Sequence, residues 1–166
     1  MKNLITALFA LNITIITATG APAKEMKYFG ITQELFPEEY CMALNIYYEA
    51  RSSNLADKYA VADVVLNRVE SARYPDTICD VVHQGYRKGR RDCQFSWYCD
   101  GKSDNPQDID RWMEAQTIAW SITKWDKFRG ISEGATHYHA TYVKPHWASR
   151  LQLIGRIGAH IFYRED

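Results

Sequence analysis

The chain has 166 residues, of which 46% are hydrophobic and 13% aromatic, enough to bury one core but too few for two large domains. The 20 Lys and Arg residues balance the 20 Asp and Glu residues, so the formal net charge is +0 at pH 7. A neutral chain has no global field that would draw it to nucleic acid or to an acidic membrane. Any anionic partner must therefore be met by a local patch.

The N-terminal segment has the features of an export signal. A short basic start is followed by a mainly apolar stretch over residues 4–17, and Ala21-Pro22-Ala23 places small residues where signal peptidase cleaves. We expect residues 1–23 to be a signal peptide, with an uncleaved N-terminal anchor as the alternative, and the protein to be periplasmic or extracellular. Residues 24–36 are expected to be a lead-in segment and residues 37–166 to form one domain.

The four cysteines, Cys41, Cys79, Cys93 and Cys99, fit the same compartment. An oxidising environment favours pairing them as two disulfides. Three connectivities are possible. A local bridge between Cys93 and Cys99 would leave Cys41 to pair with Cys79, but the spacing alone does not decide between the three.

Helices are predicted over most of the chain. The first is expected at residues 37–51, because Pro37 suits a first helical turn and Glu38 and Glu39 suit its positive end. Residues 52–54 offer caps for a second helix at 55–71, and apolar residues at helical spacing continue it. A short helix at 78–84 and a long one at 109–128 follow. Polar loops are expected at 85–92 and 100–107.

The C-terminal part has a different pattern. Residues 135–143 alternate as a strand would, and residues 151–164 place Gly155 and Gly158 between β-branched and aromatic residues. The second stretch is expected to be a further strand or one arm of a hairpin. The fold class predicted is α+β, mostly helical, with a small antiparallel sheet near the C-terminus.

A glutamate, Glu49, stands near the end of the first predicted helix, which is apolar on nearly every side. Such a helix belongs in the core, so this carboxyl would be partly desolvated, and desolvation raises a carboxyl pKa. A raised pKa is what a general acid needs at neutral pH. The alternative is a structural ion pair with Arg51, Lys58 or Arg68.

Two further segments carry side chains suited to binding. Residues 93–101, CQFSWYCDG, place aromatic and small polar groups between two cysteines, which suits stacking against a sugar ring; the alternative is that these aromatics cover the core. In Thr136-His137-Tyr138-His139, strand alternation puts the two histidines on one face and Thr136 and Tyr138 on the other. The histidines could also begin a zinc site with Glu49, His83, His146 or His160, but the chain has no HExxH or paired CxxC spacing.

A local basic patch lies in GYRKGRRDC, which contains Arg87, Lys88, Arg90 and Arg91. It could meet anionic stem peptides or lactyl carboxylates of a cell-wall polymer, or it could be a solvated loop. No P-loop, GxGxxG or GxSxG motif is present, so phosphate, dinucleotide and serine-hydrolase functions have no support.

Six segments in order resemble the SleB/CwlJ cell wall hydrolases: ALNIYYEAR, AVADVVLNRV, YPDTICDVVHQG, CQFSWYCDG, GATHYHA and IGAHIFYR. The resemblance covers nearly all of the chain from about residue 40. It implies a lysozyme-like catalytic domain, without cofactor or metal, that cuts the glycan strands of peptidoglycan. The implied partner is therefore the glycan strand, with no nucleic acid and no stable protein partner. The best-known members of the family also have a separate N-terminal peptidoglycan-binding domain, and residues 1–39 show no segment that resembles it.

The resemblance also assigns roles. It makes Glu49 the catalytic acid and base of a lytic transglycosylase, which would leave 1,6-anhydromuramic ends. The matching positions Gln94, Phe95, Ser96, Thr136, His137, Tyr138 and His139 would line the substrate cleft. The alternatives are a hydrolysing muramidase, with water activated by a carboxylate such as Asp100, a zinc-dependent amidase, and a peptidoglycan-binding module without activity.

Overall fold

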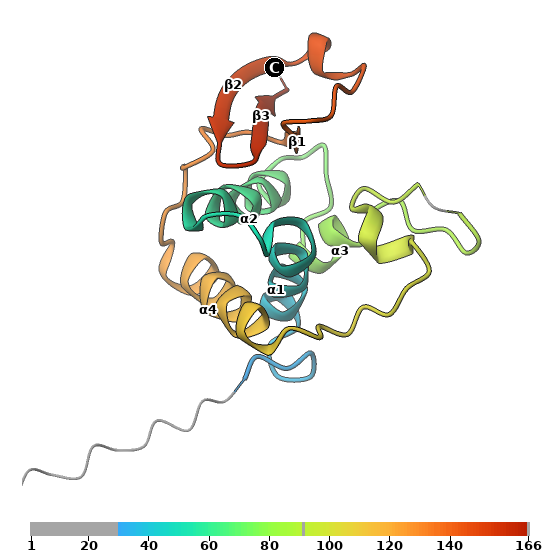
Figure 1. Cartoon of the computed structure of the whole chain (residues 1–166), viewed down its shortest axis with the longest axis vertical. Helices are drawn as coiled ribbons and strands as arrows, with labels where there is room; N and C mark the ends of the chain where they lie inside the picture. Colours follow the sequence, from blue (N-terminus) through green and yellow to red (C-terminus); the bar gives the residue numbers. More distant parts are fainter. Residues whose placement is uncertain (1–29, 91, 166) are drawn as a thin grey trace, which may run out of the picture.

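The computed structural model describes residues 30–90 and 92–165, and it shows a helical body with a small sheet packed on one side (Figure 1). The predicted signal peptide lies outside the described residues. The elements in chain order are α1 (Pro37–Ala50), α2 (Leu55–Val69), α3 (Ile78–Val82), the 3-10 turn η1 (Ser96–Cys99), α4 (Ile109–Trp125), β1 (His137–Ala140), the 3-10 turn η2 (Ala148–Arg150), β2 (Gln152–Ile157) and β3 (His160–Arg164). The mostly helical α+β class is confirmed.

Local sequence signals explain where the helices begin. Pro37 occupies the first turn of α1, as predicted, followed by two acidic residues at the positive end of the helix. The side chain of Asn54 caps α2 by accepting a hydrogen bond from the backbone of Asp57 at 2.9 Å. Thr77 and Asp108 cap α3 and α4 in the same way. The last helix ends three residues earlier than expected, because Asp126 adopts a left-handed conformation with φ 49°.

The first helix lies at the centre of the helical body. It packs against α2, α3 and α4 (Figure 1), and its residues Met42, Ala43 and Ile46 are completely buried. A second, smaller apolar cluster lies between α2 and the sheet and includes Val61, Val64 and Phe162. The α2 helix therefore contributes to both cores, and it joins the sheet to the helix that carries Glu49.

The sheet is a three-stranded antiparallel one with β3 in the middle. The two segments predicted as strands have other limits in the structure. Only four residues of the 135–143 segment form a strand, and the 151–164 segment forms both arms of a hairpin. Gly158 makes the hairpin turn with φ +57°, and a Cβ there would lie 2.7 Å from the Cβ of Asp57. This turn requires glycine, because the hairpin closes against the first turn of α2.

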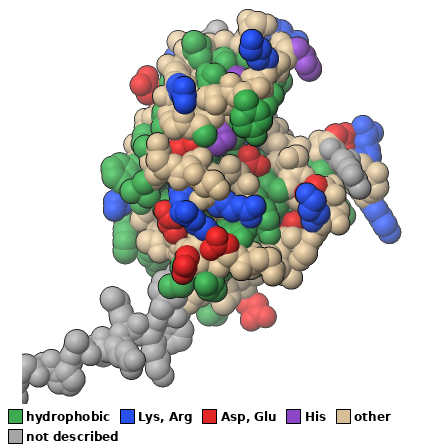
Figure 2. Space-filling view, in the orientation of Figure 1, with side chains coloured by type: hydrophobic (Ala, Val, Ile, Leu, Met, Phe, Trp, Pro, Cys, Tyr) green, Lys and Arg blue, Asp and Glu red, His purple; other side chains and the backbone are tan. Residues whose placement is uncertain are grey.

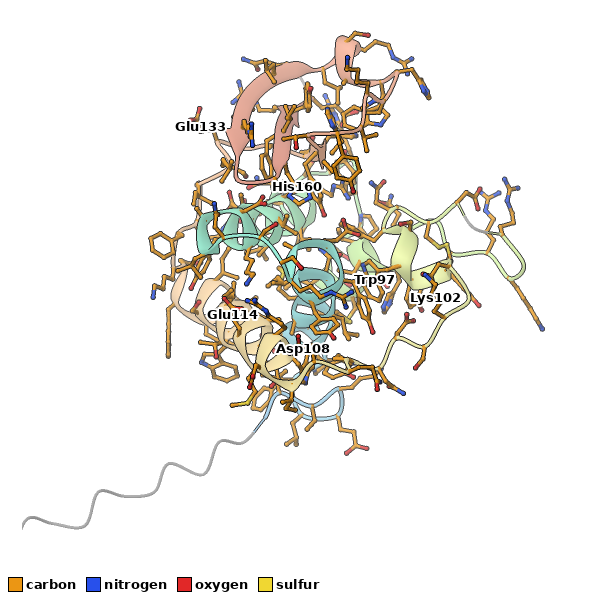
Figure 3. All side chains as sticks on the ribbon, viewed as in Figure 1. Trp97, Lys102, Asp108, Glu114, Glu133 and His160 are labelled. Atoms are coloured by element: carbon orange, nitrogen blue, oxygen red, sulfur yellow. A yellow bond between two sulfur atoms is a disulfide. The ribbon has the colours of Figure 1, made fainter. Side chains whose placement is uncertain are left out.

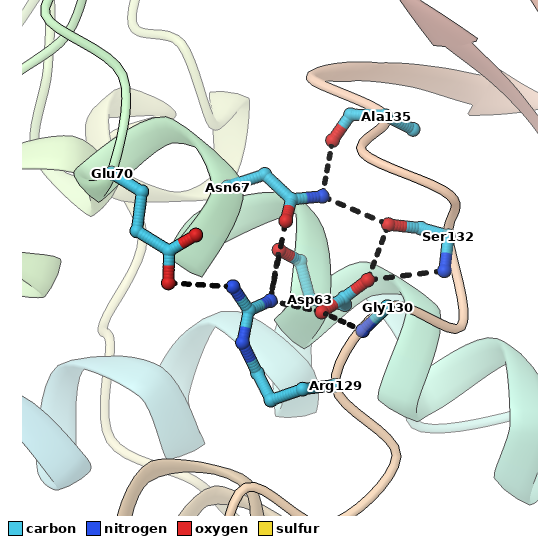
Figure 4. Close-up of polar contacts among 7 residues, drawn as sticks. All are labelled: Asp63, Asn67, Glu70, Arg129, Gly130, Ser132 and Ala135. Atoms are coloured by element: carbon cyan, nitrogen blue, oxygen red, sulfur yellow. Dashed lines mark hydrogen bonds and ion pairs between the residues drawn. The ribbon is translucent and has the colours of Figure 1, made fainter.

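A buried carboxylate fixes the segment between α4 and β1 (Figure 4). Asp63, on α2, is completely buried and accepts hydrogen bonds from the backbone of Gly130 and from the backbone and hydroxyl of Ser132. It also forms an ion pair with Arg129. Asn67, one turn further on α2, donates to the carbonyl of Ala135 at 2.8 Å. The position of β1 is therefore set by α2 before the strand begins.

Two disulfides are present, and their connectivity is the one in which the local bridge forms. Cys41–Cys79 joins α1 to α3, and Cys93–Cys99 closes the loop that leads into η1. The described residues contain no free cysteine. No helix in the described ranges is long and apolar enough to cross a membrane.

Candidate active site

Glu49 lies in the last turn of α1 and is half-buried. Its Oε2 accepts a hydrogen bond of 3.2 Å from the hydroxyl of Tyr138, on β1. Burial raises the pKa of the Glu49 carboxyl, and this effect outweighs the hydrogen bond and the positive charges of His160 and Arg68, which lower it. The Glu49 carboxyl therefore keeps its proton at pH values above those at which a glutamate usually loses it.

The structural ion pair considered for Glu49 does not form. Lys58 pairs with Glu114 at 2.7 Å, and the guanidinium of Arg51 lies over the ring of Tyr47, 5.3 Å from its centroid. Within residues 30–90 and 92–165, no salt bridge includes Glu49. Its proton is therefore not displaced by a paired cation.

Arg68 on α2, the third residue considered as an ion-pair partner of Glu49, is a buried cation near the active site. Its side chain is only 2% exposed, and its Nε donates to the carbonyl of Thr136 at 2.7 Å. The guanidinium lies between the rings of Tyr74 and Phe95, at 5.4 and 5.3 Å from their centroids. With its amide oxygen turned toward this group, Gln94 accepts from Nη2 at 3.1 Å. Arg68 thus links α2, β1 and the segment before η1.

A buried pair of side chains, Asp57 and His160, packs against the ring of Tyr138. The ring of Tyr138 contacts that of His160 edge-on, with centroids 5.1 Å apart. His160 Nδ1 lies 2.9 Å from Oδ1 of Asp57, and Oδ2 of Asp57 accepts a hydrogen bond from the backbone of Ala159. Figure 3 shows His160 between the sheet and α2. Burial alone would raise the pKa of Asp57, but these hydrogen bonds lower it overall.

The three predicted substrate-binding residues at positions 94–96 differ in their exposure to solvent. Gln94 and Ser96 are exposed, so they remain available to a ligand. Phe95 is only 3% exposed and packs in the helical core beneath Arg68. The enclosed ring has no free face against which a sugar could stack, so the role of Phe95 in lining the substrate site stays a prediction without geometric support.

The predicted residues of β1 lie on two faces of the sheet. Tyr138 points toward Glu49 and donates a hydrogen bond to its carboxyl. His137 and His139 point to the other face, where both pack against Trp147 and where His139 Nε2 lies 3.0 Å from the hydroxyl of Tyr163. The two histidines thus lie on the face of the sheet opposite to Glu49, and their contact with a bound glycan strand stays a prediction. Thr136 is 8% exposed and holds Arg68 through its carbonyl.

Sequence reasoning missed the part played by the buried polar residues. From the sequence, Arg68 is expected only as an ion-pair partner of Glu49, and no role is predicted for Asp57. The sequence signal is that both charged residues lie in a helix whose buried face is otherwise largely apolar, among residues such as Ala60, Val61 and Val64. Trp97 was grouped with the sugar-binding aromatics, yet it is 7% exposed and donates its Nε1 to Asn45 at 3.3 Å (Figure 3).

The zinc alternative gains no geometric support. In the described part of the chain, no three His, Cys, Asp or Glu side chains are grouped as metal ligands. The second-carboxylate candidate Asp100 lies at the end of η1, where it forms an ion pair of 3.3 Å with Lys102.

Comparison with known proteins gives the same class. Residues 52–163, more than half of the chain, match the family model for cell wall hydrolases. The match begins three residues after Glu49, so it does not itself include that residue. The structure resembles the catalytic domain of the germination-specific lytic transglycosylase SleB from Bacillus anthracis, with 27% identity, a TM-score of 0.56, and coverage of 82% of this chain and 98% of that one. The catalytic domain of the SleB protein from Bacillus cereus matches with 26% identity, a TM-score of 0.53, and coverage of 77% and 91%. Among proteins with curated descriptions, none matches significantly.

The fold is thus that of a lysozyme-like catalytic domain, and its best-placed acid is a half-buried glutamate. The chain belongs to the cell wall hydrolase family, so it is an enzyme that degrades peptidoglycan. A substrate in the cell wall and two disulfides are both consistent with export.

Proposed function

We propose that the enzyme is a lytic transglycosylase in which Glu49 is the general acid and then the general base. The protonated carboxyl gives its proton to the glycosidic oxygen between N-acetylmuramic acid and N-acetylglucosamine, and the C1–O bond of the muramic residue breaks. The resulting carboxylate then takes the proton from the muramic C6 hydroxyl as O6 bonds to C1. The products are a new glycan end and a 1,6-anhydromuramic end, and the carboxyl is protonated again.

The observation that carries this proposal is the state of the Glu49 carboxyl. Burial raises its pKa, no ion pair in the described ranges includes it, and the Tyr138 hydroxyl orients it. The same group can therefore hold a proton for the first step and accept one in the second. The likeness to a domain described as a lytic transglycosylase supports this chemistry over hydrolysis. In this reaction the substrate supplies its own nucleophile, so no second carboxylate at a fixed distance is needed.

Replacing Glu49 by glutamine tests its role. We expect Glu49→Gln to lower kcat/KM for the release of fragments from purified peptidoglycan by at least about 100-fold, as for the loss of a general acid–base group. The thermal midpoint should stay nearly unchanged, because glutamine has almost the same shape and can still accept a hydrogen bond from Tyr138.

The matched control is Glu34→Gln, which makes the same change at an exposed glutamate outside α1. It should leave kcat/KM unchanged. Full activity in Glu49→Gln would show that another group supplies the proton.

A further inference from the structure

The loop between α3 and η1 projects from the helical body (Figure 1). Its described basic side chains, those of Arg87, Lys88 and Arg90, are exposed, and Figure 2 shows basic side chains gathered on this projection. The base of the loop is closed, because the backbone of Gln94 donates to the carbonyl of Gln84 at 2.9 Å. The basic side chains are thus presented by a loop whose two ends are held together.

A cavity of about 390 Å³ lies between this loop and the segment around η1. Its wall includes two aromatic rings, Tyr86 and Tyr98, whose centroids are 5.4 Å apart, and two cations, Arg90 and Lys102. Tyr86 is 55% exposed, so one ring face is open to a ligand. Figure 3 shows Lys102 on the side of the molecule from which the loop projects. Aromatic rings beside cations suit a ligand that has an apolar part and an acidic group.

The acidic neighbours of these cations do not block them. Arg90 pairs with Asp92 at 2.8 Å and Lys102 with Asp100 at 3.3 Å. The cationic side chains are 59% and 83% exposed, and exposed ion pairs of this kind contribute little free energy. An incoming carboxylate can therefore replace or share either partner, and the planar guanidinium of Arg90 can bind it through two parallel hydrogen bonds.

A series of ring contacts fixes this cavity relative to the active site. Tyr48, which precedes Glu49 in α1, stacks on Trp97 with centroids 4.8 Å apart. Trp97 contacts Tyr98 edge-on at 5.8 Å, and Tyr98 forms the cavity wall. Packed aromatic side chains thus connect the cavity wall to the residue that precedes Glu49.

We propose that this cavity binds a carboxylate-bearing stem peptide of the peptidoglycan strand that Glu49 cleaves. The proposal rests on the proposed function, since the peptide and the scissile bond belong to the same polymer. A membrane fits the cavity less well than a peptide does. The chain has no net charge, and a bounded cavity lined by two rings selects a small group rather than a bilayer surface.

The test compares two substrates for one double variant, Arg90→Gln with Lys102→Gln. We expect about a tenfold loss of kcat/KM on intact peptidoglycan, mainly through KM, because two charge-assisted contacts are lost. On the same glycan strands after an amidase has removed their peptides, the double variant should have the kcat/KM of the wild type. The control variant, Arg111→Gln with Lys127→Gln, removes the same charge from exposed positions near the two ends of α4 and should match the wild type on both substrates.

Equal losses on both substrates, or an equal loss in the control variant, would overturn the proposal. So would a double variant with unchanged kinetics whose sedimentation with anionic phosphatidylglycerol vesicles is reduced, since that result would assign the loop to a membrane. If the wild type cleaves neither substrate, the proposed function fails, and titration with a synthetic stem peptide containing D-glutamate decides on the cavity separately. Binding by the wild type and control but not by the double variant would support it, and equal binding by all three would refute it.

Discussion

Glu49 is subject to opposing effects. Burial raises its pKa, while the Tyr138 hydroxyl and the charges of His160 and Arg68 lower it. A general acid works only while protonated, so activity should fall as the pH rises through the pKa of Glu49. The pH at which activity falls therefore reports how far burial, which raises the pKa of Glu49, outweighs the three polar neighbours, which lower it.

Removing the Tyr138 hydroxyl should shift this balance. Tyr138→Phe keeps the ring contacts with His160 and Phe162 but removes the hydrogen bond that lowers the pKa of Glu49. The pKa of Glu49 should therefore rise further, and the descending limb of kcat/KM against pH should move to higher pH.

The control for this pH profile is Tyr163→Phe, which removes a hydroxyl on the opposite face of the sheet. It should leave the descending limb where the wild type has it. A limb that moves to lower pH in Tyr138→Phe, or does not move, would contradict the assigned hydrogen bond.

Among the elements, α2 organises the site although it carries no proposed catalytic residue. Three of its polar side chains hold the C-terminal part of the chain: Asp57 the β2–β3 hairpin, Asp63 the segment after α4, and Arg68 the start of β1. All three are buried. Tyr138 reaches Glu49 only because these contacts dock the sheet on α2.

Loss of the Asp57 charge should weaken this docking. We expect Asp57→Asn to lower the free energy of unfolding by about 1–3 kcal/mol, because it weakens the buried hydrogen bonds to His160 and to the backbone of Ala159, measured by urea denaturation at pH 7. The matched substitution Asp110→Asn, at an exposed position in α4, should have little effect.

The pH dependence of stability gives a second measure of Asp57. Because its pKa is lowered in the folded state, its contribution is fully present above the unfolded pKa of about 3.9 and is lost as the pH falls through the folded value. The wild type should lose stability below about pH 4 more steeply than Asp57→Asn does. Parallel curves for the two proteins would show that this carboxylate is not the group responsible.

The helices were predictable and the strands less so, for a physical reason. Helix starts depend on local features, namely the fixed φ of Pro37 and the side-chain caps of Asn54 and Asp108, and the structure confirms the predicted starts at residues 37, 55 and 109. Strand limits depend on distant pairing, so the alternating 135–143 segment predicted a longer strand than β3 can pair. The contact between Glu49 and Tyr138 could not be predicted for the same reason, because the two residues are 89 positions apart in sequence.

At the scale of the whole molecule, the two disulfides differ in the length of chain that they close. Cys41–Cys79 spans 38 residues and joins two helices of the core, whereas Cys93–Cys99 spans 6. On the chain-entropy model, the first stabilises the fold by about 4 kcal/mol and the second by about 2 kcal/mol.

We therefore expect Cys41→Ser with Cys79→Ser to lower the free energy of unfolding more than Cys93→Ser with Cys99→Ser does. Denaturant unfolding of both double variants beside the wild type measures this difference. A larger loss in the 93/99 variant would show that strain or packing, rather than loop length, decides the contribution.

In the proposed reaction, Glu49 cleaves the glycan strand by transferring C1 of the muramic residue to its own C6 hydroxyl. The decisive experiment is mass spectrometry of the soluble fragments released from purified peptidoglycan, with wild type beside Glu49→Gln and a known muramidase on the same substrate. We expect 1,6-anhydromuramic ends, lighter by one water than reducing ends, from the wild type alone. Reducing ends from the wild type would contradict transglycosylation, and no fragments from a substrate that the muramidase digests would contradict the proposed activity itself.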